Sequence, residues 1–136
     1  MRSSRSVREV MSTNVMVVGP NDKLSSAADV MKLGRVRHMP VIADGELVGI
    51  VSQRDLFHNA LLRALGYGGH AAGKLLDMFL VKEAMVTTVL TTTPDASIAS
   101  AAAVMLEHKV GCLPVMDGDD LVGIITEADF VAQALH

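Results

Sequence analysis

The sequence predicts an α+β fold made of two similar β-α-β-β-α units, packed as a pair about a pseudo-two-fold axis. Two observations lead to this prediction. Residues 7–57 can be laid on residues 81–131 without a gap, at a constant offset of 74 positions. Each copy also shows the same order of strand-like and helix-like apolar patterns. Two copies are too few for an open solenoid, so we expect them to close on each other.

The repeat is clearest near the end of each copy. Residues 47–55 read LVGIVSQRD, and residues 121–129 read LVGIITEAD. Both stretches predict a buried strand that turns at once into a helix. Ser52 and Thr126 stand at this junction, and an acid follows three residues later in each case, at Asp55 and Asp129.

The first copy opens with a short predicted strand at residues 15–18 and a turn at residues 19–22 (GPND). A helix follows and ends near Gly34. Apolar residues at helical spacing form its predicted buried face: Leu24, Ala27, Ala28 and Met31.

A hairpin completes each copy. In the first copy its strands are residues 38–42 and 47–51, around the turn pair Asp44 and Gly45, and a helix begins at Ser52. The matching elements of the second copy are a short strand at Val89 and Leu90, a helical face of Ile98, Ala101, Ala102 and Met105, hairpin strands at residues 113–116 and 121–125, and a helix from Thr126.

The predicted domain organisation is a first unit at residues 7–57, a connector at 58–80 and a second unit at 81–134. The connector is apolar and carries helix-like patterns on both sides of a break at residues 66–69 (GYGG). Because it is too apolar for a flexible Gly/Ser linker, we expect it to pack on the pair or on a second copy of the chain.

Composition excludes several classes of function. The net charge of −3 has mixed signs and no basic block, which argues against a nucleic-acid partner. No apolar run approaches the roughly 20 residues that cross a bilayer, so no membrane association is expected. The single cysteine excludes a disulfide framework and favours a cytoplasmic location. The five histidines lack metal-ligand spacing, and we expect no metal site.

The repeated unit resembles the CBS domain, which is named from cystathionine β-synthase. The resemblance rests on an apolar-Pro-Val strand, a hairpin, and a Gly-apolar-apolar-Ser/Thr-x-x-Asp motif in both copies. Two such domains in tandem are similar to a Bateman module, and the match covers nearly the whole chain. The resemblance implies a stand-alone regulatory module without catalytic activity.

The resemblance also implies that an adenine nucleotide binds in the clefts between the two units. The ligand would be AMP, ADP or ATP, or another adenosyl compound such as NAD or S-adenosylmethionine, and no catalytic cofactor is expected. In this family the acid of the motif holds the ribose and the hydroxyl residue faces the phosphates. The implied site residues are Val15, Met16, Arg37, His38, Met39, Pro40, Ser52, Arg54 and Asp55 in the first site, and Val89, Leu90, Cys112, Leu113, Pro114, Thr126 and Asp129 in the second.

Physical chemistry supports this use of the motif and also offers an alternative. The N-terminus of a helix presents unpaired N–H groups and a partial positive charge, which suit a phosphate. A carboxylate can accept both hydrogen bonds of a ribose diol. Ser-x-x-Asp and Thr-x-x-Asp are equally capping boxes that only satisfy the helix terminus. The spacing alone leaves both interpretations open.

The two copies differ in charge around this motif. The first has Arg37 and Arg54, where the second has Gly111 and Ala128. Arginine can bind a phosphate with two hydrogen bonds, so the first site is expected to prefer the more phosphate-rich ligand. The alternative is that these arginines are ordinary solvated surface charges.

The sequence therefore predicts a module that binds an adenosyl ligand and passes its level to an unknown regulated protein. A homodimer is expected because the resemblance implies paired modules. Two other classes of function are open. The chain could be a structural interaction module with degenerate clefts, or an enzyme, which turnover of ATP would reveal.

Overall fold

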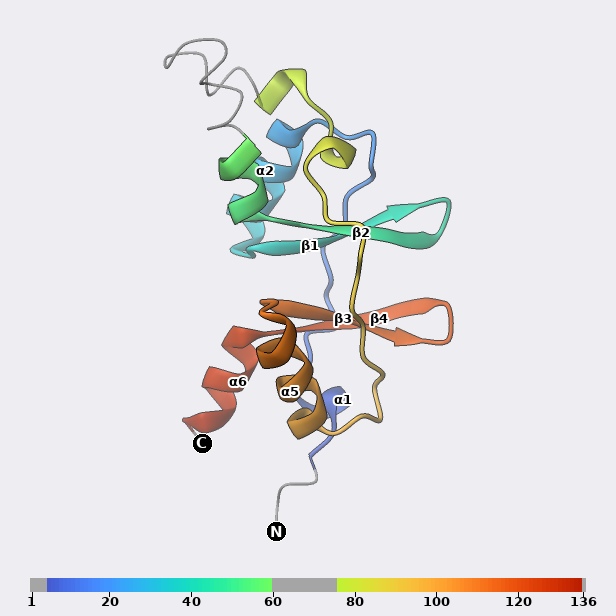
Figure 1. Cartoon of the computed structure of the whole chain (residues 1–136), viewed down its shortest axis with the longest axis vertical. Coiled ribbons are helices and arrows are strands. Elements are labelled where there is room, and N and C mark those ends of the chain that lie inside the picture. The colour runs from blue at the N-terminus through green and yellow to red at the C-terminus, as the bar shows by residue number, and fades with distance from the viewer. Residues whose placement is uncertain (1–4, 60–75, 136) are drawn as a thin grey trace. The chain divides into compact units, whose positions relative to one another are not determined.

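A computed structural model describes residues 5–59 and 76–135 of the 136-residue chain. These residues form two compact units, each with one two-stranded antiparallel sheet (Figure 1). Residues 16–89 form one unit from an unbroken stretch of chain, and we call it the continuous unit. Residues 1–15 and 90–136 form the other, which we call the discontinuous unit.

The described part of the continuous unit contains helix α2, a hairpin, two further helical stretches and a 3-10 turn. Its elements are α2 (Leu24–Gly34), β1 (His38–Ala43), β2 (Glu46–Ser52), the helical residues 53–59 and 76–78, and the 3-10 turn η3 (Val81–Glu83). Asp44 and Gly45 join the two strands with φ angles of 51° and 79°. Two positive φ angles are what a tight type I′ hairpin requires, so the Asp-Gly prediction is confirmed.

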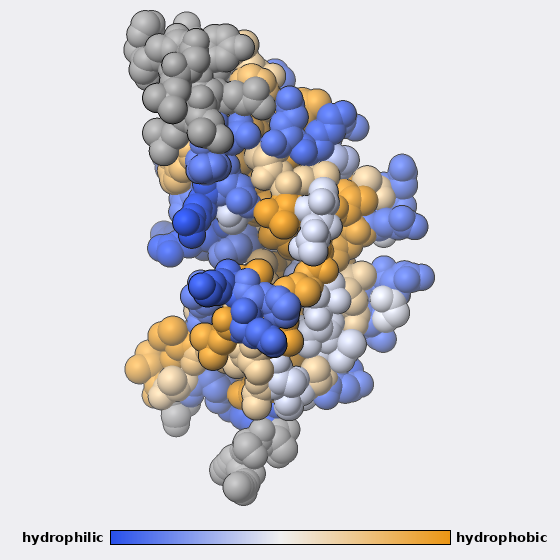
Figure 2. Space-filling view, viewed as in Figure 1, coloured by the Kyte–Doolittle hydropathy of each residue, from blue (hydrophilic) through white to orange (hydrophobic). Residues whose placement is uncertain are grey.

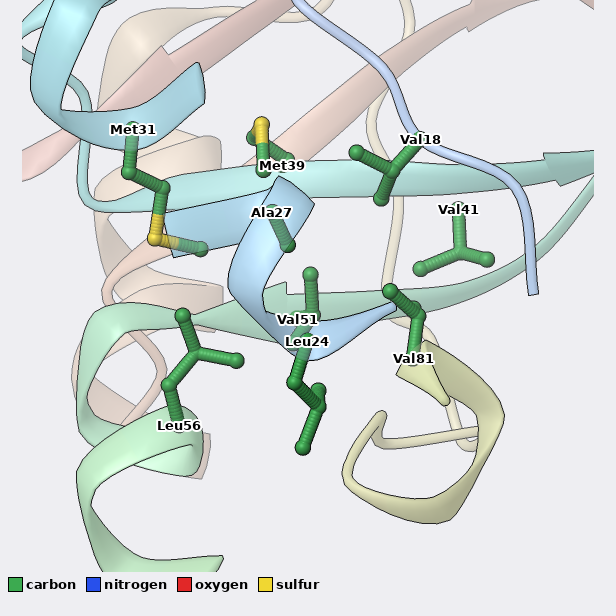
Figure 3. Close-up of a cluster of buried hydrophobic side chains, with 9 residues drawn as sticks. All are labelled: Val18, Leu24, Ala27, Met31, Met39, Val41, Val51, Leu56 and Val81. Atoms are coloured by element: carbon green, nitrogen blue, oxygen red, sulfur yellow. The ribbon is translucent and has the colours of Figure 1, made fainter. Parts of the chain in front are cut away.

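The core of the continuous unit lies between α2 and the hairpin. Figure 3 shows the side chains of α2 directed toward those of β1 and β2, with Val81 of η3 and Leu56 closing the cluster. The predicted helical face is correct for Leu24, Ala27 and Met31, which are buried, whereas Ala28 is only partly buried. The apolar spacing of the helix therefore predicted which side of it is covered.

The discontinuous unit repeats this plan. Its elements are α1 (Val7–Val10), α5 (Ile98–His108), β3 (Cys112–Asp117), β4 (Asp120–Thr126) and α6 (Glu127–Ala134). Its buried core consists of Val7, Ala101, Met105, Leu113, Val115 and Ile125. Gly118 opens the hairpin turn with a φ of 65°, a conformation that glycine adopts without steric cost.

The compact units and the sequence repeats have different boundaries. The leading segment of each repeat, residues 7–15 in the first and residues 81–89 in the second, packs with the other repeat. The N–H of Val7 donates to the carbonyl of Ala96 at 2.8 Å, and the N–H of Val81 donates to that of Asp22 at 2.8 Å. Both valines are fully buried, each in the core of the unit it joins. The structure groups residues 16–89 in one compact unit and joins residues 1–15 to residues 90–136 in the other.

The leading segments also make matching contacts with the edges of the two sheets. Ser12 and Ile124 exchange two backbone hydrogen bonds of 2.9 and 3.0 Å, and Val86 and Ile50 exchange two of 2.9 and 2.8 Å. Each pair adds an isolated bridge to the edge of a hairpin. Both repeats thus use the same contacts, displaced by the same 74 positions.

Two expected short strands are wrong in extent. Residues 15–18 contribute only one parallel bridge, between Val18 and Val41. In the second repeat the equivalent bridge joins Thr92 to Val115, and Val89 and Leu90 form no strand. Proline follows each bridge residue by two positions, at Pro20 and Pro94, and it cannot donate the N–H that would extend the ladder.

Most of the predicted connector lies outside the described residues, including the glycine-rich break at residues 66–69. At its ends, residues 58–59 and 76–78 are helical, as expected. Among the described residues, no helix has the length and apolarity needed to cross a membrane.

Candidate functional site

In the continuous unit, the predicted site centres on the turn from β2 into the helix at residues 53–59. The N–H of Ser52 donates to Asp55 Oδ2 at 2.8 Å, and the N–H of Asp55 donates to Ser52 Oγ at 3.0 Å. The motif is therefore a capping box, as the alternative interpretation expected. Both side chains are partly buried, so the cap holds a hydroxyl and a carboxylate in fixed positions at the helix N-terminus.

The start of β1 lies against the same turn. The N–H of Gln53 donates to the carbonyl of Arg37 at 2.8 Å, and His38 stands opposite Ser52 in the register of the hairpin. This hydrogen bond satisfies one of the donors that a helix N-terminus leaves open. The hairpin thus brings Arg37 and His38 beside Ser52 and Asp55, although 14 positions separate His38 from Ser52 along the chain.

Two arginines of this turn are exposed. The ion pairs among the described residues join Arg5 to Glu9 and Arg8 to Asp95, and neither involves Arg37 or Arg54. No carboxylate of the described chain therefore neutralises these two guanidinium groups. An anionic ligand at the turn would find both of them available for a charge-assisted hydrogen bond.

The remaining predicted residues of the first site have different degrees of exposure. Met39 and Pro40 are fully buried, and Met39 belongs to the core of the continuous unit. Met16 is partly buried and packs against that core, with its thioether over Gly34. Val15 is partly buried but belongs to the discontinuous unit. Met39 and Pro40 therefore shape the strand from within, and Met16 is better exposed to meet a ligand.

The discontinuous unit has an equivalent turn from β4 into α6. The N–H of Thr126 donates to Asp129 Oδ2 at 2.8 Å, and Thr126 Oγ1 lies 3.4 Å from the same oxygen. The N–H of Glu127 donates to the carbonyl of Gly111 at 3.2 Å, and Cys112 stands opposite Thr126 in the hairpin. The backbone arrangement of the first turn is thus reproduced.

The flanking residues of the second turn are also placed. Leu113 and Pro114 are fully buried, and Cys112 is buried with 6% of its surface exposed. Leu90 packs against the core of the discontinuous unit, whereas Val89 is partly buried and belongs to the continuous unit.

The chemistry of the two turns differs more than their geometry. The first turn carries Arg37, Arg54 and one acid, Asp55. The second carries two acids, Glu127 and Asp129, and no arginine or lysine at the equivalent positions. A helix N-terminus favours negative charge, so the acids of the second turn already occupy the environment that a phosphate would use. Among the described residues, no group of three or more His, Cys, Asp or Glu side chains could hold a metal ion.

One contributor to the turn was missed by the sequence analysis. The carbonyl of Arg37 receives the first N–H of the helix, and the carbonyl of Gly111 does so in the other unit. No side-chain pattern reports a backbone carbonyl. The matched position before the apolar-Pro-Val strand, at the same offset in both repeats, was the available signal.

Comparison with known proteins places this fold in a family. The CBS domain family model matches residues 7–61 and 81–136. The chain is 31% identical over 130 residues to the CBS domain-containing protein YhcV of Bacillus subtilis, covering 96% of this chain and 86% of YhcV. It also matches part of a homoserine O-acetyltransferase of Methanosphaerula palustris at 36% identity, but there it spans only 22% of the relative's length.

Solved structures agree with these matches. A putative acetoin utilization protein (AcuB) from Vibrio cholerae superposes with a TM-score of 0.80 at 34% identity, covering 96% of this chain and 90% of that one. The structure of CBSX2 in complex with AMP superposes with a TM-score of 0.75 at 29% identity, covering 96% of each chain. The predicted α+β fold with two similar units is thereby confirmed, and the chain belongs to the CBS domain family, with two CBS domains in tandem.

Proposed function

We propose that this chain is a non-catalytic regulatory module that binds an adenosyl ligand, with AMP, ADP or ATP as the expected forms. The observation that carries the proposal is the turn after β2, where the Ser52–Asp55 capping box stands beside Arg37 and Arg54. Both arginines are exposed, and neither pairs with a carboxylate of the described residues. The likeness to CBSX2, whose structure contains AMP, supports an adenosyl ligand.

Each group at this turn has a chemical use toward such a ligand. Among the described residues, the cap of Ser52 uses Oδ2 of Asp55, and Oδ1 accepts no hydrogen bond. A ribose hydroxyl can therefore donate to Oδ1 without breaking the cap. Arg37 and Arg54 would meet the phosphates, and the adenine would lie on partly buried apolar side chains such as Met16.

Regulation follows if the ligand binds one conformation of the module better than another. A ligand with equal affinity for both conformations would shift neither population, whatever its concentration. The regulated protein is either attached to such a module or separate from it. The partial match to a much longer acetyltransferase agrees with the attached form in that relative.

Replacing Asp55 with asparagine tests the site directly. Alanine would also remove the helix cap, at a cost of about 1 kcal/mol, and so would confuse binding with stability. Asparagine keeps one oxygen for the N–H of Ser52 but loses the charge and the second acceptor. We expect Asp55→Asn to weaken AMP binding about tenfold or more in calorimetric titration, since a hydrogen bond to a charged group contributes roughly 1.5–3 kcal/mol.

Asp129→Asn is the matched control, because Asp129 makes the same cap in the other unit. This variant should leave the affinity of the first turn for AMP nearly unchanged. If wild-type protein binds no adenosyl ligand, or if both variants bind AMP as wild type does, the proposed site is wrong.

A protein-interaction role is the second candidate, and one feature of α6 favours it. No residue of this helix is buried. Val131 within the helix is 61% exposed, and Leu135 directly after the helix is 81% exposed. Figure 2 shows apolar residues gathered on the lower left of the molecule, where Figure 1 places α6. We propose a second copy of the chain as the partner, which sedimentation velocity tests, since a monomer at all working concentrations would contradict it.

A further inference from the structure

Residues 5–12, which we call the N-terminal segment, complete the discontinuous unit. Backbone hydrogen bonds join the segment to the loop before α5, to α5 itself and to β4. Ile98 donates to Arg5, Val7 to Ala96, Arg8 to Pro94, and Ser12 exchanges two bonds with Ile124. Arg8 adds an ion pair with Asp95 at 3.1 Å.

The segment also supplies part of the apolar core. Val7 is fully buried, and Val10 and Met11 pack on the same cluster. The thioether of Met11 occupies the space over Gly123, where a Cβ would lie only 2.5 Å from its sulfur. The rest of the unit therefore presents a shaped surface for this segment, with a deep site for Val7 and a shallow one for Met11.

No short stretch of chain connects the N-terminal segment to the rest of the discontinuous unit. Residues 16–89, a complete compact unit, separate it in sequence from residues 90–136. The intervening residues 13–17 make no hydrogen bond to any described residue, and Thr13, Asn14 and Val17 are exposed. Helix α1 has only four residues, so its shape depends on the surface it is bound to.

From this we infer that the surface of the discontinuous unit also binds the N-terminal segment of a second copy of the chain, giving a segment-swapped dimer. Every contact described above can be remade between two copies without new chemistry, since the occupant is identical. Exchange of identical elements is a low-cost route to a dimer because the bonds lost within one chain are regained between chains. The stretch at residues 13–17, in which Thr13, Asn14 and Val17 are exposed, would change its path.

Variants that carry one introduced cysteine, in addition to the buried Cys112, report the exchange. Ser6 and Ser97 form an antiparallel bridge, and the bonds of their neighbours mark it as a non-hydrogen-bonded pair. The Cα atoms of such pairs lie about 4.5 Å apart, within the range that a disulfide spans. Ser6→Cys chains and differently tagged Ser97→Cys chains are mixed, incubated and oxidised. We expect a disulfide-linked dimer carrying both tags.

Variants of Val7 give two opposite expectations. Val7→Ala in the Ser6→Cys chain removes two buried methyl groups from the donated segment, and should lower the mixed dimer about tenfold. Val7→Ala in the Ser97→Cys chain instead weakens that chain's own segment, and should raise the mixed dimer. Val17→Ala, at a position that is 45% exposed, is the control in both chains.

A pairing of Ser6→Cys with Ser26→Cys measures disulfides formed by random collision, since Ser26 is exposed on α2 of the other unit. Mixed dimer at or below this background would overturn the proposal, provided circular dichroism shows folded variants. Complete disulfide formation within the Ser6→Cys/Ser97→Cys double variant, together with that background level, would show that the segment binds only its own chain.

Discussion

Gly49 and Gly123 show how one residue of the repeated motif is determined by a distant segment. A Cβ on Gly49 would lie 2.8 Å from Met85 Sδ and 3.0 Å from the carbonyl oxygen of Val86. That carbonyl belongs to the bridge with Ile50, so it cannot withdraw without losing backbone hydrogen bonds. The glycine in the Leu-Val-Gly-Ile strand is therefore needed for close approach of the exchanged segment.

We expect Gly49→Ala to lower the free energy of unfolding by about 1–3 kcal/mol, the usual cost of overpacking a tight contact. Gly19→Ala is the control, because its Cβ would meet only the Asp22 carboxyl at an ordinary 3.6 Å. Urea denaturation of the two variants measures the difference. Equal midpoints would mean that the close approach at Gly49 does not contribute to stability.

Arg54 is the residue that most distinguishes the two turns chemically, since Ala128 replaces it in the second. If Arg54 binds a phosphate, Arg54→Ala should weaken binding of ATP more than binding of adenosine. A charge-assisted hydrogen bond of roughly 1.5–3 kcal/mol corresponds to about a tenfold or greater loss. Lys32→Ala, an exposed cation on α2, is the control for loss of general positive charge. Equal losses for ATP and adenosine would assign Arg54 no phosphate contact.

At the scale of elements, the exchanged leading segments have the clearest consequence. Val7 belongs to the first repeat but is buried among α5, β3 and β4, and Val81 belongs to the second but is buried among α2, β1 and β2. Val7→Ala should therefore loosen the second hairpin, and Val81→Ala the first. Each change should cost about 1.5–3 kcal/mol, because two buried methyl groups are lost and a small cavity remains.

Hydrogen exchange of backbone amides locates these effects. Val7→Ala is expected to speed exchange in β3 and β4 more than in β1 and β2, and Val81→Ala to do the reverse. If each variant instead loosens the hairpin of its own repeat, the assignment of the leading segments is wrong. Val17→Ala, a change at a half-exposed valine, should leave both hairpins unchanged.

Charge stabilises the turn within the N-terminal segment. The backbone N–H of Ser6 donates to Glu9 Oε2 at 2.7 Å, and its hydroxyl donates to the same oxygen at 3.2 Å. These hydrogen bonds, and the nearby Arg5, lower the pKa of the Glu9 carboxyl below its ordinary value of 4.5. A lowered folded-state pKa means that this contribution is present above pH 4.5 and is lost as the pH falls through the folded-state value.

Local elements were predictable because their signals are local. The helical face of α2, the Asp44-Gly45 turn and the helix that follows Ser52 each depend on residues within a few positions. The partners of the leading segments were not predictable in this way. Val7 and Val81 have the same apolar character whether they pack on their own repeat or on the other, so the sequence pattern is identical for both arrangements.

At the scale of the whole molecule, the repeat predicted the family and two copies of one plan, and the comparisons confirm both. The binding site itself stays a prediction. The motif residues Ser52 and Asp55 do lie together, with Arg37 and His38 beside them. Met39 and Leu113, expected to contact adenine, are fully buried, because the strand alternation directs these side chains into the core.

The two units also divide the predicted functions unequally. The turn of the continuous unit combines the cap with cations, whereas the turn of the discontinuous unit combines it with a second acid. We therefore expect an anionic ligand at the turn of the continuous unit. The second turn is expected to take a less charged adenosyl compound or none.

Thermal unfolding with a panel of adenosyl ligands tests whether the chain binds such a ligand, with the matching guanosine nucleotides as controls. A ligand that binds only the folded state at 100 times its Kd stabilises it by about 2.7 kcal/mol, which raises the unfolding midpoint measurably. We predict that at least one adenosyl ligand raises the midpoint of wild-type protein, that its guanosine counterpart does not, and that the rise is reduced in Asp55→Asn. An unchanged midpoint with every adenosyl ligand, or an equal rise with guanosine nucleotides, would contradict this prediction.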